Sequence, residues 1–204
     1  MNSKEIEEQL DQFLLKVQKP GRYVGGEFNS VHKNPDTIKT RIALAFPDIY
    51  DLGVPNLGLS IFYDQLNQMD DVWAERTYLP WEDMEMEMRN RNIPLYTLES
   101  KTPLDKMDII GITIPYESLY TNVLNLLDLA QIPIFSKDRS EGYPLIIAGG
   151  HSTFNPEPMS AFIDVFVIGE GEEVITDIIR IYQSWKSLSK PKFELLHEIS
   201  QLEG

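Results

Sequence analysis

The sequence predicts an α/β domain in which helices cover both faces of a doubly wound, mainly parallel sheet. Its clearest strand candidates are short runs that are almost wholly apolar instead of alternating, which is typical of strands covered on both faces. Segments with helical spacing separate these runs, and strands that alternate with helices in this way form parallel sheets of the Rossmann-like or flavodoxin-like kind. The runs are residues 41–46, 109–114, 145–148 and 165–168.

A helix and an irregular segment are expected before the first strand. Residues 5–17 place their apolar side chains on one helical stripe, with acidic residues early, where the helix dipole favours them. Lys19-Pro20-Gly21 ends this helix. Residues 23–36 contain glycine and proline but no periodicity, so we expect an arm that wraps onto the body.

The remaining elements alternate along the chain. Helices are predicted over 56–68, 81–91, 117–130, 156–162 and 172–187, with a weaker strand over 72–78. In the second of these helices Trp81, Met84 and Met88 fall at i, i+3 and i+7. This spacing favours a core stripe over a methionine-lined cofactor site.

Composition excludes several classes of function. The 18 basic and 32 acidic residues give a net charge of −14, which excludes a nucleic-acid-binding face built on excess Lys and Arg and disfavours an anionic membrane surface. No apolar stretch is long enough to span a membrane, and the polar, acidic N-terminus does not resemble a signal peptide, so we expect a cytoplasmic protein. The absence of cysteine removes disulfides, thiol nucleophiles and thiolate metal ligands from these residues.

The chemistry is expected at one edge of the sheet. In open α/β sheets ligands bind beyond the carboxyl ends of the strands, so the turns that follow the strands should converge. These turns are residues 47–53, 115–117, 149–153 and 169–173, and none carries Lys or Arg. A bound diphosphate would have to rely on helix N-termini alone while the carboxylates of these turns repelled it, and neither G-x-G-x-x-G nor G-x-x-x-x-G-K-[ST] occurs, so a nucleotide site is not expected. A large ligand with neutral amides or ring faces suits glycine-rich turns of this kind better.

Each feature of these turns also has a purely structural interpretation. Gly149-Gly150 is compatible with a tight strand-to-helix turn, and Glu170 and Glu172 with charges that stabilise a helix start. His151 is either a polar loop residue or an acid–base group. The carboxylates of residues 48 and 51 could serve hydrolysis, but no nucleophile and base accompany them.

Several motifs together carry a family resemblance. Asp48-x-Tyr50-x-x-Gly53, with Gly149-Gly150 much later, resembles the cobalamin-binding pattern D-x-H-x-x-G … G-G with tyrosine in place of histidine. Residues 164–172 resemble the D-x-x-x-x-G-E-G-E signature that ends the B12-binding-like domain of many radical SAM proteins. With residues 23–27, 120–124 and 155–158, the chain is similar to the N-terminal region of an uncharacterised B12-binding-like radical SAM family.

The resemblance implies a cobalamin-binding-like domain that is not catalytic by itself and positions a corrinoid or a substrate at the carboxyl edge of the sheet. It divides the chain into an N-terminal helix and arm (1–37), the α/β domain (38–190) and the start of a linker (191–204). The linker would lead to the protein's own radical SAM domain, the expected partner, whose C-x-x-x-C-x-x-C motif holds a [4Fe–4S] cluster that cleaves S-adenosylmethionine. No catalytic or metal-ligating residue is expected in this chain.

The resemblance and the edge turns together give a set of expected cofactor-binding residues. The set is Asp48, Tyr50, Gly53, Tyr116, Glu117, Gly149, Gly150, His151, Gly169, Glu170, Gly171 and Glu172. A phenol with a pKa near 10 is a poor cobalt ligand, so Tyr50 does not favour ligation of cobalt by the protein. Two alternatives stay open: cobalamin binds without a protein ligand, or the domain has lost the cofactor. A cofactor-free interaction module that docks a basic partner through an acidic crevice is the alternative function, and a hydrolase using Asp48, Asp51 and His151 is a third.

Overall fold

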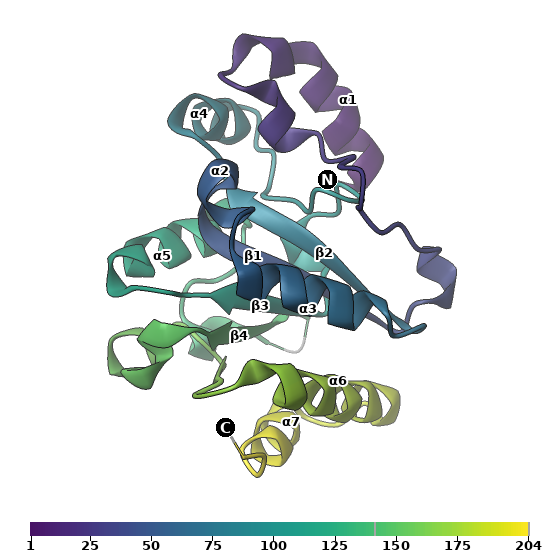
Figure 1. Ribbon diagram of the computed structural model, residues 1–204, viewed down its shortest axis with the longest axis vertical. Coiled ribbons are helices and arrows are strands. Elements are labelled where there is room, and N and C mark those ends of the chain that lie inside the picture. Colours follow the sequence, from purple (N-terminus) through teal and green to yellow (C-terminus); the bar gives the residue numbers. More distant parts are fainter. Residues whose placement is uncertain (141, 204) are drawn as a thin grey trace.

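A five-stranded, wholly parallel sheet forms the centre of the molecule (Figure 1). The computed structural model describes residues 1–140 and 142–203. The strands are β1 (Thr40–Ile49), β2 (Val72–Leu79), β3 (Ile109–Thr113), β4 (Leu145–Gly149) and β5 (Val165–Phe166), in the spatial order β2-β1-β3-β4-β5. The predicted doubly wound α/β class is confirmed.

The direction of each connection decides which face its helix covers. The step from β1 to β2 runs across the sheet in the opposite direction to the step from β3 to β4. Right-handed crossovers therefore place α3 (Leu57–Asn67) on one face and α5 (Tyr120–Leu129) on the other. Helix α6 (Gly171–Leu188) shares the face of α3, since Gln65 Nε2 donates to the carbonyl of Glu172 at 2.5 Å.

This strand order creates a switch point between β1 and β3. The chain moves outward from β1 in one direction and later from β3 in the other, so the helices that follow these two strands diverge. Such a divergence leaves a crevice at the carboxyl edge of the sheet, and ligands of open α/β proteins bind there. The fold thus points to one place for a functional site.

The N-terminal region packs against the β2 side of the domain. Helix α1 (Ser3–Phe13) buries Ile6, Leu10 and Phe13, and 3₁₀ turns follow at Leu14–Lys16 and Pro20–Tyr23. The segment after them lies along β2, where Trp73 Nε1 donates to the carbonyl of Val31 at 3.0 Å. The outward backbone groups of this edge strand are paired within the chain, since the Asn67 amide bonds to both backbone groups of Ala74 and Leu98 N donates to the Arg76 carbonyl, so they are not free to pair with another chain.

Four details of the predicted elements are wrong. The helix predicted over residues 5–17 ends at Phe13, and a 3₁₀ turn follows it. Residues 156–162 form only a 3₁₀ turn at Glu157–Met159, in which Met159 N donates to the Pro156 carbonyl at 3.0 Å and Ser160 N to the Glu157 carbonyl at 3.2 Å. Strand β5 has two residues instead of four. Trp81 is the extended N-cap of α4 (Glu82–Asn90) and is 40% exposed, so only the two methionines of the predicted stripe are buried.

The C-terminal helices close the β5 side. Helix α7 (Lys192–Ile199) packs on α6 and buries Leu195 and Ile199. Asp164 joins this region together, because it accepts hydrogen bonds from Arg139 Nη2 and Ile146 N, both at 2.9 Å, and lies 3.4 Å from Lys192 Nζ. Within the described residues no helix is long and apolar enough to cross a membrane.

Candidate functional site

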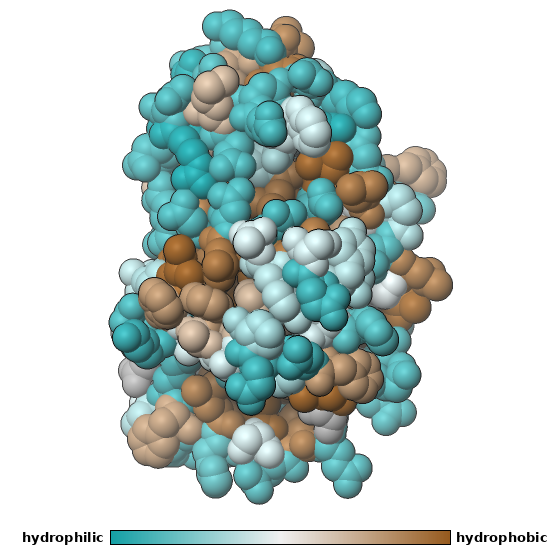
Figure 2. Space-filling view, turned by 90° about the vertical axis from the view of Figure 1, so that its left-hand side faces the viewer, coloured by the Kyte–Doolittle hydropathy of each residue, from teal (hydrophilic) through white to brown (hydrophobic). Residues whose placement is uncertain are grey.

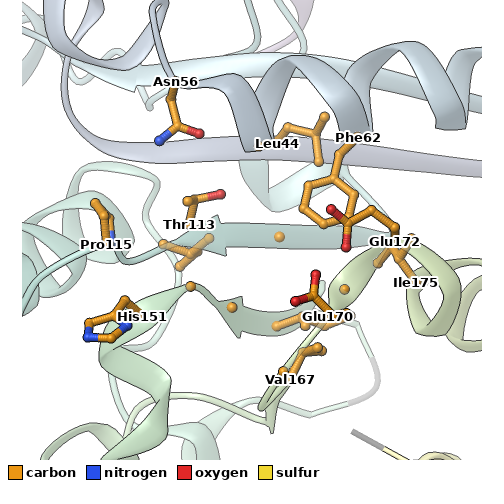
Figure 3. A pocket seen from close by; sticks show the side chains of 18 of the residues that line it. Leu44, Asn56, Phe62, Thr113, Pro115, His151, Val167, Glu170, Glu172 and Ile175 are labelled. Carbon is orange, nitrogen blue, oxygen red and sulfur yellow. The ribbon is translucent and has the colours of Figure 1, made fainter.

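A cavity of about 330 Å³ lies at the switch point, between the sheet and helices α3 and α6 (Figure 3). Its floor comes from β1, β3 and β4, and its rim comes from the turns that follow β3, β4 and β5. This volume is in the range of small-molecule sites. The cavity is lined by Ile42, Leu44, Asn56, Gly58, Phe62, Gly111, Ile112, Thr113, Pro115, Ile147, Gly149, Gly150, His151, Val167, Gly169, Glu170, Gly171, Glu172 and Ile175.

Glycine keeps the cavity open. Six of the twelve glycines of the chain line it. A Cβ on Gly171 would stand 2.8 Å from Cζ of Phe62, so the absence of a side chain lets the α3 ring pack directly on the start of α6. A Cβ on Gly111 would point between Leu44 and Ile42 at ordinary contact distances, so a side chain there would occupy the cavity floor.

The Gly149-Gly150 turn has a backbone that only glycine adopts easily. Gly150 has φ +110°, and a Cβ there would stand 2.8 Å from the carbonyl oxygen of Ile114. Ile114 N donates to the Gly149 carbonyl at 2.8 Å, and the hydroxyl of Thr153 donates to the carbonyls of Gly150 and Val167, both at 2.8 Å. The turn therefore ties together the ends of β3, β4 and β5 beside the cavity.

The ionisable groups of the cavity include two carboxylates. No Lys or Arg is among the lining residues, whose titratable side chains are His151, Glu170 and Glu172. The carboxylates of Glu170 and Glu172 project from the start of α6 toward the cavity (Figure 3). Among the described residues neither forms a salt bridge.

The structure brings together seven of the twelve expected cofactor-binding residues, all from the last two turns. The others do not line the cavity: Asp48, Tyr50, Gly53, Tyr116 and Glu117. Asp48 Oδ1 accepts from the adjacent Ile49 N at 2.7 Å, and Gly53 packs against the ring of Tyr78. Whether any of the twelve binds a cofactor stays a prediction.

Tyr50 belongs to a polar cluster outside the cavity. Its hydroxyl donates to Oε1 of Glu27 at 2.9 Å, and Oε2 of the same carboxylate accepts from Arg76 Nη2 at 2.9 Å. Burial, followed by the hydrogen bond and negative charge of Glu27, raises the pKa of Tyr50. Burial by itself would raise the pKa of Glu27, but its backbone hydrogen bond, Arg76 and Tyr50 outweigh this effect and lower it. Tyr50 thus ties the arm to the domain.

The expectation that the edge turns have no cation near them is wrong for Asp51. The N-terminal segment brings Lys19 Nζ to 2.8 Å from Oδ1 and Arg22 Nε to 2.5 Å from Oδ2 of this carboxylate. Hydrogen bonds from these two side chains lower the pKa of Asp51 to about 2. Asp51 is therefore paired with the arm, whereas the acidic residues of the cavity rim are not.

Sequence reasoning missed the α3 side of the site. Asn56 caps α3 by accepting from Leu59 N at 2.9 Å, and Phe62 reaches the cavity one turn later. Thr113 and Pro115 enter from the end of β3. The helix predicted over 56–68 begins at this residue, but no local signal distinguishes a helix residue over a crevice from one over a filled core.

Fold and site together define the class of protein: a parallel α/β domain with a glycine-lined cavity at the carboxyl edge of its sheet and, among the described lining residues, no Lys or Arg. Residues 58–204, well over half of the chain, match the family described as "Radical SAM proteins, N-terminal". The chain belongs to this family. The match begins after the Asp48–Gly53 motif and includes every cavity residue except Ile42, Leu44 and Asn56.

One curated relative shows the same region in a longer protein. The chain is 24% identical over 143 residues to the uncharacterized protein MJ0966 of Methanocaldococcus jannaschii, an alignment that covers 68% of this chain and 26% of the relative. The chain thus spans about a quarter of the relative's length. No solved structure matches the chain. Within residues 1–140 and 142–203, no group of three or more His, Asp or Glu side chains is arranged to hold a metal ion.

Proposed function

We propose that this chain is the ligand-binding N-terminal domain of a radical SAM protein, which holds a corrinoid or a substrate at the carboxyl edge of its sheet and is not catalytic by itself. The observation that carries the proposal is the cavity at the switch point, with its apolar floor, glycine rim and lack of cations. Membership of a family of N-terminal regions supports the assignment of the reaction to another part of the protein.

The residues of the edge fit a corrinoid only in part. Apolar walls and glycine turns, which let a ligand approach the backbone closely, suit a large ring system with neutral side groups, which is the surface a corrinoid presents. Tyr50 does not fit as a cobalt ligand, because its hydroxyl is held by Glu27 and lies outside the cavity lining. We therefore propose binding without cobalt ligation by Tyr50.

The other cofactors would be held elsewhere. This chain has no cysteine, so it cannot supply thiolate ligands to a [4Fe–4S] cluster. We assign the cluster and S-adenosylmethionine to the protein's own radical SAM domain. The role left to this chain is to orient a ligand and to shield it from water at the carboxyl edge.

Gel filtration with hydroxocobalamin tests the corrinoid. We expect corrin absorbance to elute with the protein and Gly111→Val to reduce it, because a valine side chain would fill the cavity floor in a strand that favours β-branched residues. Gly21→Val is the matched control, since a Cβ there meets no atom within 4 Å. Complete separation of corrin from the unmodified protein would exclude a corrinoid ligand.

An interaction module is the second candidate function, and a band of exposed apolar residues around the carboxyl edge favours it. The turns after β1, β3 and β4 lie at the left of Figure 1, and hydrophobic side chains gather in several places on that side (Figure 2). Large apolar residues at least 37% exposed occur in the turns after four strands: Leu52, Val54, Leu57, Tyr116, Phe154 and Ile168. Together with the acidic rim, this band suits a partner with a basic and apolar surface, such as the radical SAM domain.

Association in trans with a separately produced radical SAM domain tests this second candidate. Binding that weakens as salt rises, and does not change with corrinoid, would favour the interaction module over the ligand-binding domain. Leu57→Lys replaces an exposed apolar side chain of the band, outside the cavity lining, with a charge that repels a basic partner, and should weaken association. If neither salt nor this substitution changes the affinity of association, docking through this edge is contradicted.

A further inference from the structure

The cavity combines apolar walls with two carboxylates that have no protein cation opposite them. Glu170 and Glu172 are the residues before and after Gly171, at the start of an 18-residue helix. The helix dipole stabilises acidic residues at this position by about 0.3–1 kcal/mol, which explains why acids occur there but not why these two face a cavity. Glu173 shares the helix start but does not line the cavity.

Two other carboxylates of the domain differ from those of the cavity, because cations of the protein are paired with them. Asp51 is paired with Lys19 and Arg22, and the nearly inaccessible Asp164 is paired with Arg139. The fold therefore supplies cations to carboxylates that hold the structure together. Around the cavity it supplies none, so the negative charge of the rim is available to a ligand.

An aromatic ring lies near one of these carboxylates, Glu172 (Figure 3). Phe62 projects from α3 toward the start of α6, and its ring lies near the Glu172 side chain in Figure 3. Aromatic faces attract cations, and carboxylates beside apolar walls gain more from a cation than carboxylates in water do. The flat ring and the apolar floor from Leu44 and Ile147 also favour a flat, apolar body.

We propose that this cavity takes a ligand group in which a flat, apolar body carries a positive charge, such as an amidinium, an aryl ammonium or a protonated heterocycle. Glu170 and Glu172 select the charge and Phe62 contacts the ring. This inference rests on the proposed function, since it names the chemical class of ligand for the same cavity. The proposal also predicts that neutral ligands of the same shape bind more weakly than the cationic ligand, and that anionic ligands of this shape bind most weakly.

Three probes of nearly the same shape that carry a positive, no or a negative charge test the proposal: benzamidine, benzamide and benzoate, titrated calorimetrically into the full chain. We expect benzamidine to bind about tenfold more tightly than benzamide, as a charge-assisted hydrogen bond provides, and benzoate to bind least. Glu172→Gln should weaken benzamidine binding about tenfold and leave benzamide binding unchanged. Glu173→Gln removes one negative charge from the same helix start, as Glu172→Gln does, and should leave the binding of both benzamidine and benzamide unchanged.

Three results would overturn the proposal: no binding of any probe, benzoate binding as tightly as benzamidine, or equal effects of Glu172→Gln and Glu173→Gln. Circular dichroism of both variants establishes that they are folded. The hydroxocobalamin experiment distinguishes failure of the proposed charge selectivity from failure of the proposed ligand-binding function. If corrin elutes with the protein while benzamidine does not bind, the charge selectivity is wrong and the ligand-binding role stands.

Discussion

Replacement of Gly150 by alanine should destabilise the domain more than any other glycine-to-alanine change at the site. Its φ of +110° is a conformation that side chains rarely adopt, which costs about 1–3 kcal/mol. The new Cβ would also stand 2.8 Å from the Ile114 carbonyl oxygen and 3.1 Å from the Ile114 nitrogen. Because these are backbone atoms that also bond to the Gly149–Ser152 turn, they cannot rotate away, and we add roughly 1–3 kcal/mol for their displacement.

Two other glycines separate the contributions. Gly169 has φ +129° but no atom within 4 Å of its Cβ position, so Gly169→Ala measures the backbone conformation by itself. Gly21 has neither feature, and Gly21→Ala should leave stability unchanged or raise it by up to about 1 kcal/mol. The expected order of destabilisation is therefore Gly150→Ala, then Gly169→Ala, then Gly21→Ala.

Urea unfolding followed by circular dichroism and tryptophan fluorescence gives the three free-energy differences. The two probes must report coincident transitions for a two-state treatment. The total expected for Gly150→Ala, about 2–6 kcal/mol, is a large part of the roughly 5–15 kcal/mol of a typical domain. If Gly150→Ala and Gly169→Ala destabilise equally, the close approach to Ile114 contributes nothing and the explanation of the Gly-Gly turn is wrong.

Three further predictions concern ion pairs and Tyr50. Asp164→Asn should cost about 3–5 kcal/mol in urea unfolding, because it leaves the inaccessible Arg139 guanidinium without its carboxylate; an effect below 1 kcal/mol would contradict this role. The Asp51 carboxyl should titrate near 2 in NMR, below its usual 3.8. Since its folded pKa is the lower one, its ion pairs stabilise the fold above pH 3.8, and this contribution is lost as the pH falls toward 2; Asp51→Asn should remove that part of the pH dependence. Tyr50→Phe should loosen the arm, seen as faster amide exchange around Glu27, without reducing corrin elution with the protein, whereas lost corrin would place Tyr50 in the binding site.

The candidate site was predictable where it depends on strand ends and not where it depends on packing. The turns after β4 and β5 follow directly from buried apolar runs, so the glycines at 149, 150, 169 and 171 were assigned to the correct edge. The turn after β1 was assigned to the same edge by the same rule, but its side chains face the N-terminal arm. Which way a turn directs its side chains depends on contacts distant in the sequence.

The sequence by itself determined the fold class, because apolar runs of strand length separated by helical periods have few solutions other than a covered parallel sheet. It also determined that the edge turns carry no cation of their own. Only the tertiary structure decided which acids stay unpaired. It brought Lys19 and Arg22, which are 32 and 29 residues away in the sequence, to Asp51 and brought no cation to Glu170 or Glu172. The physical reason is that charge pairing acts through space, and a linear pattern does not record which distant side chains come within 4 Å.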